Sequence, residues 1–298
     1  MPASTYEVFD ERFNACFRKD AKVEMLWTGA RWCEGPAYFP AGRCLIWSDI
    51  PNDRLLRWDE CDGHVTVFRH PANYANGNTV DRDGRLVTAE HGRRVTRTEH
   101  DGRVTVLADR FQGKRLNSPN DIVVKSDRSI WFTDPPYGIL SDYQGWKGES
   151  ELGKNYVFRI DGQSGEMTVV NDDCDRPNGL AFSLDEKLLY IADSGFSARN
   201  IKVYDVTDDG KLKNGRVFAP CTAGRFDGFR LDDAGRLWSA TEDGVHCHDP
   251  DGTLVGKINV PEVLSNLVFG GPKRNRLFIC GATSLYCVWL TVNGAKIF

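Results

Sequence analysis

Short hydrophobic runs alternate with polar turns along almost the whole chain, and the same unit recurs about six times. In the first unit the runs cover Pro36–Phe39, Cys44–Ser48, Arg54–Asp59 and Val65–Arg69. The Asp62-Gly63 pair between the last two runs is typical of a tight β-hairpin. A repeat of about 40–60 residues that holds several short strands predicts either a propeller blade or a solenoid coil.

The last unit lacks one strand, and this favours the propeller. It offers Leu267–Gly270, Leu277–Cys280 and Leu285–Thr291, whereas Lys22–Thr28 precedes the first unit and resembles the fourth strands. Pairing of the two ends would leave no open blade, whereas a solenoid would need terminal caps that the sequence does not offer. We therefore predict an all-β, six-bladed propeller of four-stranded antiparallel blades, with the N-terminal strand closing the last blade.

This repeat predicts a single domain over residues 1–298, with an N-terminal extension at 1–21 and the six blades at 22–298. Helix is expected only before Lys22. A net charge of −4 with interspersed signs argues against nucleic acid or an anionic membrane as partner. The first twenty residues lack the apolar core of a signal peptide, so a cytoplasmic protein is expected, although a removed signal would leave no trace. We expect a monomer or a weak homodimer.

Nine cysteines are scattered along the chain without any CxxC pair. This excludes a zinc ribbon and a thioredoxin-like motif. Several of them lie inside apolar runs, where a free cysteine behaves as a small hydrophobic residue. The expected state is reduced and mostly buried.

Each unit opens with an oxygen-bearing side chain just before its first strand. The openings are Glu34-Gly35, Asn76-Gly77, Asn120-Asp121, Asn178-Gly179, Asp227-Gly228 and Ser265-Asn266. In a blade the first strand is innermost and antiparallel to the second, so its start lies beside the end of the second strand. One mouth of the central channel should therefore carry these openings, with Asp49, His91, Asp134, Asp193 and Glu242 nearby.

Two interpretations of the openings remain. Asn-Gly and Asp-Gly are common turn formers, because their side chains bond their own backbone. A turn does not, however, require an oxygen ligand at equivalent positions in six units, and Glu34 is a poor turn residue. Converging carboxylates need a counter-charge to stay ionised. A hard divalent cation would provide it, so we favour a metal site.

Several motifs together resemble one known family. They are Glu34-Gly35-Pro36, Arg115-Leu116-Asn117-Ser118-Pro119-Asn120-Asp121, Trp131-Phe132-Thr133-Asp134-Pro135, Arg176-Pro177-Asn178-Gly179-Leu180 and Phe226-Asp227-Gly228. This set is similar to the gluconolactonase, senescence marker protein 30 and luciferin-regenerating enzyme family, from about Glu34 onward. The resemblance implies a six-bladed propeller that hydrolyses sugar lactones with one divalent cation, often calcium. Mn²⁺, Mg²⁺ and Zn²⁺ are alternatives.

Carried over position by position, the resemblance implies that Glu34, Asn178 and Asp227 are the metal ligands. Asn120 matches a residue close to both metal and substrate. Animal members have an arginine two residues before that asparagine, where this chain has Ser118. The form Asn117-Ser118-Pro119-Asn120 instead resembles the bacterial gluconolactonase branch.

Lactone hydrolysis passes through a tetrahedral oxyanion, which a cation can stabilise. Our hypothesis makes Asp227 the base that takes the proton of the attacking water, and Asn120 a donor that positions water or lactone. His91 could contact the substrate or shuttle a proton, and the alternative is a surface histidine in a polar turn. Residues 135–154 lengthen the third unit on the mouth side. This insertion, with Tyr137, is either a partial lid over a sugar or ordinary packed surface.

Other chemistry is less well supported by the residues. His246 and His248 share a strand face, but they fall on a third strand away from the channel, so solvated histidines are expected. The Gly-x-Ser-x-Gly motif of serine hydrolases is absent. Our leading function is hydrolysis of a gluconolactone-like sugar lactone. The alternatives are hydrolysis of another ester or a phosphotriester at the same site, or a non-enzymatic propeller scaffold.

Overall fold

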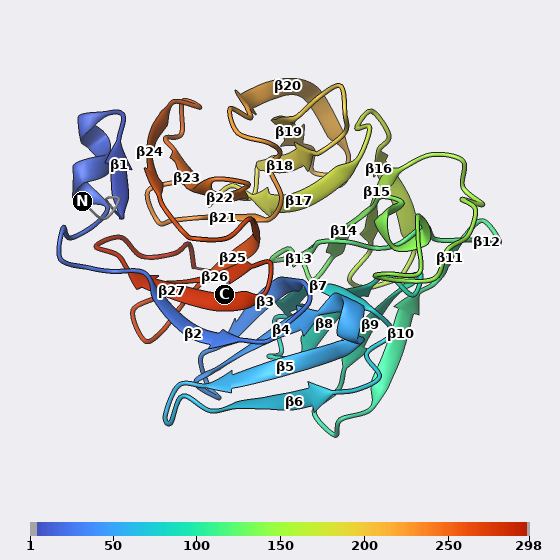
Figure 1. Cartoon of the computed structure of the whole chain (residues 1–298). Helices are drawn as coiled ribbons and strands as arrows, with labels where there is room; N and C mark the ends of the chain where they lie inside the picture. The colour runs from blue at the N-terminus through green and yellow to red at the C-terminus, as the bar shows by residue number, and fades with distance from the viewer. Residues whose placement is uncertain (1–4, 297–298) are drawn as a thin grey trace.

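The computed structural model describes residues 5–296. Its strands form six blades around a central axis, as Figure 1 shows, together with one two-stranded hairpin. Within each blade consecutive strands pair antiparallel, and the first strands of neighbouring blades contact one another at the centre. This confirms the predicted six-bladed β-propeller.

The blades follow the chain in order. Blade one is β3 (Cys33–Phe39), β4 (Cys44–Asp49), β5 (Arg54–Asp59) and β6 (Val65–Arg69), and blade two is β7 (Ala75–Val80), β8 (Leu86–Glu90), β9 (Arg94–Thr98) and β10 (Val104–Ala108). Blade three is β13 (Ile122–Val124), β14 (Ile130–Asp134), β15 (Tyr156–Ile160) and β16 (Met167–Asn171), and blade four is β17 (Pro177–Phe182), β18 (Leu188–Asp193), β19 (Asn200–Val206) and β20 (Leu212–Pro220). Blade five contains β21 (Phe229–Leu231), β22 (Leu237–Thr241), β23 (Gly244–His248) and β24 (Leu254–Ile258), and blade six contains β25 (Leu264–Gly270), β26 (Arg276–Gly281) and β27 (Ser284–Trp289). The separate hairpin is β11 (Arg110–Phe111) and β12 (Lys114–Arg115).

The ring closes by pairing of its two ends. Strand β2 (Glu24–Thr28) lies antiparallel to β27, with Glu24 opposite Cys287 and Thr28 opposite Ser284. It is therefore the outer strand of blade six, as predicted.

The segment before β2 also belongs to a blade. Strand β1 (Tyr6–Val8) pairs with β24 and gives blade five a fifth strand, which the repeat did not predict. A 3-10 helix, η1 (Glu11–Ala15), follows it and buries Phe13 completely beside Gly256, where any Cβ would collide with the Phe13 ring. Two more 3-10 helices, η2 (Ile50–Asn52) and η3 (Tyr137–Ile139), lie after Lys22, so the prediction that confined helix to the first segment is wrong. No helix within residues 5–296 is long and apolar enough to cross a membrane.

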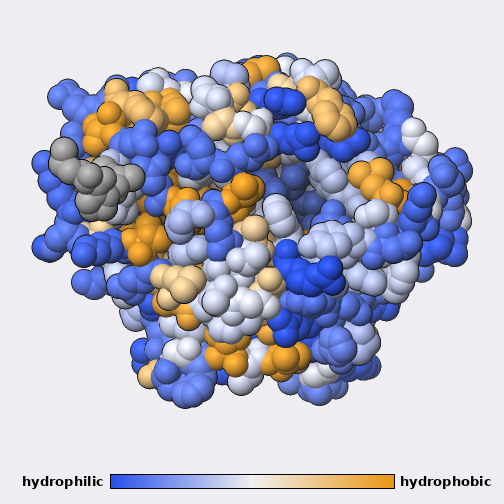
Figure 2. Space-filling view, in the orientation of Figure 1, coloured by the Kyte–Doolittle hydropathy of each residue, from blue (hydrophilic) through white to orange (hydrophobic). Residues whose placement is uncertain are grey.

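Each pair of neighbouring blades shares a hydrophobic cluster. For example, Trp47 and Trp58 of blade one pack with Phe278 of blade six, and Trp131 of blade three packs with Leu189 of blade four. Both faces of a blade are thus covered, so strands such as β4 are buried at every position instead of alternating. The face presented in Figure 2 carries hydrophobic residues in scattered groups on a largely hydrophilic surface.

All nine cysteines are free, as expected for reduced thiols. Seven are buried, Cys221 is partly buried and Cys61 is exposed. The thiols therefore serve mainly as small apolar side chains between the blades.

Candidate functional site: a carboxylate- and amide-lined cavity

The first strands of the blades all begin at the same end of the central channel. There the structure brings together five of the six opening residues around a cavity of about 240 Å³. These five are Glu34, Asn76, Asn120, Asn178 and Asp227. The sixth, Asn266, does not line the cavity, because its Nδ2 donates to Glu34 Oε2 at 3.0 Å and holds that carboxylate in place.

The glycines after the opening residues allow the blades to approach closely. A Cβ on Gly77 would lie 2.4 Å from the carbonyl oxygen of Asn120, and one on Gly179 would lie 2.3 Å from that of Asp227. The Gly77 N–H donates to the Asn120 carbonyl at 2.7 Å. At these two positions the glycine is needed for space and not for a turn, so the turn-former interpretation does not explain them.

The cavity floor holds two acids in an electrostatically unfavourable arrangement. Glu34 is 3% exposed, and its Oε2 accepts hydrogen bonds from the Gly35 N–H and the Asn266 amide. Burial, and then the charge of Asp121, raises the pKa of Glu34 above its ordinary value. Burial together with the charges of Glu34 and Asp121 raises the pKa of Asp227 well above its ordinary value, and contact with the Asn178 amide opposes this.

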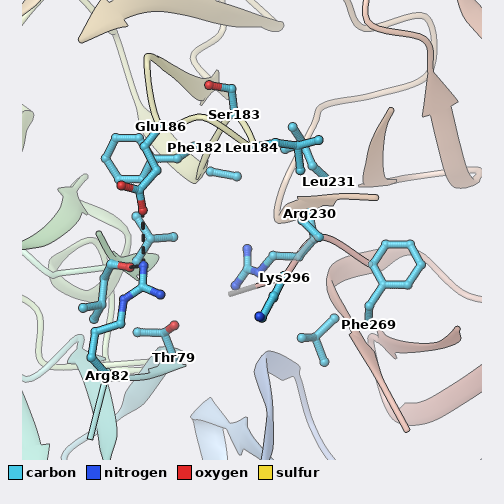
Figure 3. A pocket seen from close by; sticks show the side chains of 15 residues that line it. Thr79, Arg82, Phe182, Ser183, Leu184, Glu186, Arg230, Leu231, Phe269 and Lys296 are labelled. Atoms are coloured by element: carbon cyan, nitrogen blue, oxygen red, sulfur yellow. Dashed lines mark hydrogen bonds and ion pairs between the residues drawn. The ribbon is translucent and has the colours of Figure 1, made fainter. Parts of the chain in front are cut away.

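A partly buried ion pair lies beneath these acids in the channel. Arg230 Nη1 is 3.4 Å from Asp121 Oδ2 and donates to the Phe229 carbonyl at 2.7 Å. Arg230 also lines a second cavity, of about 130 Å³, at the opposite end of the first strands. Figure 3 shows this second cavity, where Arg82 pairs with Glu186. Arg230 therefore brings a positive charge beneath the acids from the far side of the channel.

His91 is buried in the cavity wall. Its Nδ1 is 2.8 Å from the Gln144 carbonyl, so this nitrogen donates, and Nε2 accepts from the Asn76 amide at 2.8 Å. Burial lowers the pKa of His91 to about 4. The ring is therefore neutral near pH 7, and its burial shows that the surface histidine considered from the sequence is wrong.

Some polar atoms of the cavity have no partner within the described chain. The hydroxyl of Tyr137 and Oδ1 of Asn76 are buried without a hydrogen bond to any residue in 5–296. Burial, and then the charge of Asp227, raises the pKa of Tyr137 to about 12, so the hydroxyl stays protonated. Buried polar groups without partners cost about 1–3 kcal/mol each, and binding sites are where proteins tolerate this cost.

The acids at the ends of the second strands have structural tasks. Asp134 accepts the backbone N–H groups of Asn117 and Ser118, both at 2.8 Å. Asp193 accepts those of Asp175 and Arg176, both at 3.0 Å. Each of them fixes the loop that leads into its own blade, and neither lines the cavity, whereas His91 and Glu242 do.

The insertion at 135–154 crosses the mouth and contacts other blades. The Tyr143 ring packs under the Arg31 guanidinium at 5.1 Å, and Trp146 meets Tyr74 edge-on at 5.0 Å. Ser118 anchors its start by donating to the Pro135 carbonyl at 2.6 Å. The insertion supplies Tyr137 and Gln144 to the cavity wall.

The prediction of solvated histidines at 246 and 248 is wrong. Both are 2% exposed, and both rings lie against Phe226 between blades four and five. His246 Nε2 is 2.7 Å from Asp243 Oδ1. Phe226 precedes Asp227 and Ser194 Oγ donates to its carbonyl at 2.6 Å, so the two histidines support a segment of the cavity wall.

Sequence reasoning missed several residues of the cavity. The structure adds Trp32, Gln144, Ser194 and Arg225, together with apolar positions around the mouth. Trp32 and Arg225 each stand two residues before an opening acid, and this shared offset was a usable signal. Gln144 had none, because it reaches the cavity through the fold of the insertion.

Within residues 5–296 no cluster of three or more His, Cys, Asp or Glu side chains forms a metal site. The cavity instead combines the carboxylates of Glu34 and Asp227 with amide side chains, and the exposed Glu242 adds a third carboxylate to its lining. Two carboxylates and neutral oxygen donors are a set that suits hard divalent cations.

The fold and this cavity define a six-bladed propeller with an acid- and amide-lined channel mouth. Residues 32–283 match the family described as the SMP-30/Gluconolactonase/LRE-like region. The chain therefore belongs to that family.

Relatives agree with this assignment. A gluconolactonase of Zymomonas mobilis is 33% identical, with 91% of this chain and 82% of that protein covered. The pentonolactonase XacC of Haloferax volcanii is 31% identical, with 86% and 83% covered. The structure of a gluconolactonase of Xanthomonas campestris is 40% identical and has a TM-score of 0.91, with 96% of this chain and 94% of that chain covered.

Proposed function

We propose that this chain hydrolyses a sugar lactone of the gluconolactone type at the channel-mouth cavity and uses one divalent cation. Ca²⁺ is the leading candidate for this cation. The chain is a lactone hydrolase, since it belongs to this family and resembles a gluconolactonase and a pentonolactonase over most of its length. The open-chain aldonic acid would be the product. The observation that carries the proposal is the convergence of Glu34, Asn178 and Asp227 on one cavity.

The donor set supports a cation. Burial and mutual repulsion make the ionised forms of Glu34 and Asp227 costly, and a divalent ion between them would offset that cost. Asn178 is 6% exposed and contacts Asp227, so its amide oxygen can complete a set of hard ligands. We therefore assign Glu34, Asn178 and Asp227 as the ligands.

When bound, the cation would polarise the ester carbonyl and stabilise the oxyanion. Asp227 would take the proton of the attacking water, because its carboxyl borders the cavity beside Glu34. Asn120, 5% exposed and with no side-chain hydrogen bond inside residues 5–296, would donate to the water or the lactone. His91 would act on the substrate through Asn76, whose amide it orients, and the Tyr137 hydroxyl would bind a sugar oxygen.

Metal analysis and proton release test the proposal directly. The purified protein should contain about one divalent ion per chain and should hydrolyse gluconolactone faster than the spontaneous reaction near pH 7. Chelation should abolish that difference, and re-addition of Ca²⁺, Mn²⁺, Mg²⁺ or Zn²⁺ in turn should identify the ion that restores it. A rate equal to the spontaneous one under every condition would favour the scaffold alternative.

Asp227→Ala should abolish turnover and leave the fold intact, as judged by circular dichroism. An Asp227→Ala variant with near-full kcat would remove Asp227 from the mechanism. Glu242→Gln provides a matched control, since Glu242 lines the same cavity but is exposed and outside the proposed ligand set.

A further inference from the structure

Arg225 is a cation in the cavity wall that the protein itself does not neutralise. It lines the cavity together with Asp227 and Tyr137. Within residues 5–296 its guanidinium forms neither an ion pair nor a hydrogen bond, whereas Arg230 in the channel pairs with Asp121. A partly buried arginine normally finds a carboxylate or carbonyl partner, so this arrangement calls for an explanation.

A second arginine lies in the same place. Arg225 and Arg176 both pack on the ring of Phe196, at 4.9 and 4.7 Å from its centre. Arg176 also lies 5.7 Å from the ring centre of Tyr137, and its guanidinium likewise has no ion pair in the described chain. Phe196 is 64% exposed. Aromatic contacts thus hold two positive charges at the cavity edge and leave their N–H groups available.

The acids of the cavity do not cancel this charge. Glu34 and Asp227 belong to the floor, where we propose that they bind the cation. Glu242 packs against Gly224, where an added Cβ would lie 2.0 Å from its carboxyl carbon, and it makes no ion pair with Arg225. The cavity therefore has a region for the ester at Asp227 and a separate positive region at Arg225.

We propose that the preferred lactone carries an oxyanion group, a carboxylate, phosphate or sulfonate, away from its ester, and that Arg225 binds this group. The inference rests on the proposed lactone hydrolysis and names its substrate class. A guanidinium presents paired N–H donors that match the two oxygens of such a group, and charged hydrogen bonds of this kind are stronger than those to a sugar hydroxyl. Arg176 adds a second positive charge beside the same group.

The test compares two lactones in the protein as purified. Glucono-1,5-lactone and 6-phosphoglucono-1,5-lactone share the reacting ester and differ in the oxyanion. We expect kcat/KM to be higher for the phosphorylated lactone. Arg225→Gln should lower the ratio of the two kcat/KM values about tenfold or more, mainly through KM. Arg103→Gln, on an exposed turn and without an ion pair to any described residue, controls for the loss of one charge and should leave the ratio unchanged.

Binding of the products separates this inference from the proposed hydrolysis. Titration calorimetry should show tighter binding of 6-phosphogluconate than of gluconate, and Arg225→Gln should remove the difference. If both lactones are hydrolysed but neither the ratio nor the binding responds to Arg225→Gln, the oxyanion site is refuted and the hydrolysis stands. If neither lactone is hydrolysed but binding responds, the hydrolysis fails and the oxyanion site stands.

Discussion

Replacing Glu34 by Gln should stabilise the cation-free protein while it destroys the site. The amide side chain of the Glu34→Gln variant would keep an oxygen that can accept from the Gly35 N–H and the Asn266 amide, as the carboxylate does. The substitution would remove a buried negative charge that lies near those of Asp227 and Asp121. The residues that would bind a cation are therefore a source of instability without it.

The size and sign of the effect follow from the pKa. Burial and the charge of Asp121 raise the pKa of Glu34 from 4.5 to about 7. Because the folded-state pKa lies above the unfolded value, the protein loses stability as the pH rises from about 4.5 through 7. At pH 8 Glu34 is ionised, and its charge destabilises the folded state by the full amount. That cost is about 3 kcal/mol, and Glu34→Gln should recover much of it at pH 8 and little at pH 4.5.

Urea unfolding in the presence of a chelator at both pH values measures the effect. Glu166→Gln is the control, since Glu166 is an exposed acid without an ion pair inside the described range. A saturating divalent cation should stabilise the wild type by about 2.7 kcal/mol at one hundred times its dissociation constant, and Glu34→Gln far less. A variant less stable than the wild type at pH 8 with chelator would refute the reasoning.

Three further predictions concern packing and pH. Gly77→Ala should cost about 2–3 kcal/mol, because its Cβ would lie 2.4 Å from the Asn120 carbonyl oxygen, whereas Gly148→Ala, with its nearest neighbour at 3.9 Å, should cost little in the same urea titration. Phe13→Ala should cost about 3–5 kcal/mol, since the ring is fully buried, and a loss below about 1 kcal/mol would mean that the N-terminal segment is dispensable. His91 has a folded-state pKa of about 4, so the stability it contributes is complete above pH 6.5 and falls as the pH decreases towards 4. Between pH 7 and pH 4.5 the free energy of unfolding of His91→Gln should therefore fall by about 2.5 kcal/mol less than that of the wild type. Parallel pH curves for the two proteins would contradict this.

The fold could be predicted from the sequence because a repeated local pattern specifies it. The hairpin turn Asp62-Gly63 and the strand periodicity can each be recognised within a few residues. Comparison of the units then shows that the last one lacks a strand. Strand β1 escaped prediction because Tyr6–Val8 is only three residues long and completes a blade that lies near the other end of the chain.

The cavity could be predicted only in part, for a related reason. Circular symmetry places Glu34, Asn178 and Asp227 at equivalent positions, so the repeat alone suggested that they meet. Gln144 breaks the repeat, because it reaches the cavity from an irregular insertion. The depressed pKa of His91 depends on burial beneath that insertion, where Gly138 packs against the His91 side chain, and no local pattern encodes it.

Closure of the ring by β2 and β27 also sets when the cavity can exist. Glu24 pairs with Cys287, so the last blade cannot form until the segment around Cys287 has left the ribosome. Glu34 enters the ring with the first blade and Asp227 with the fifth, and only a completed circle holds them face to face. An incomplete or newly made chain therefore lacks the assembled site, and the chain acquires it in a late step of folding that joins its two ends.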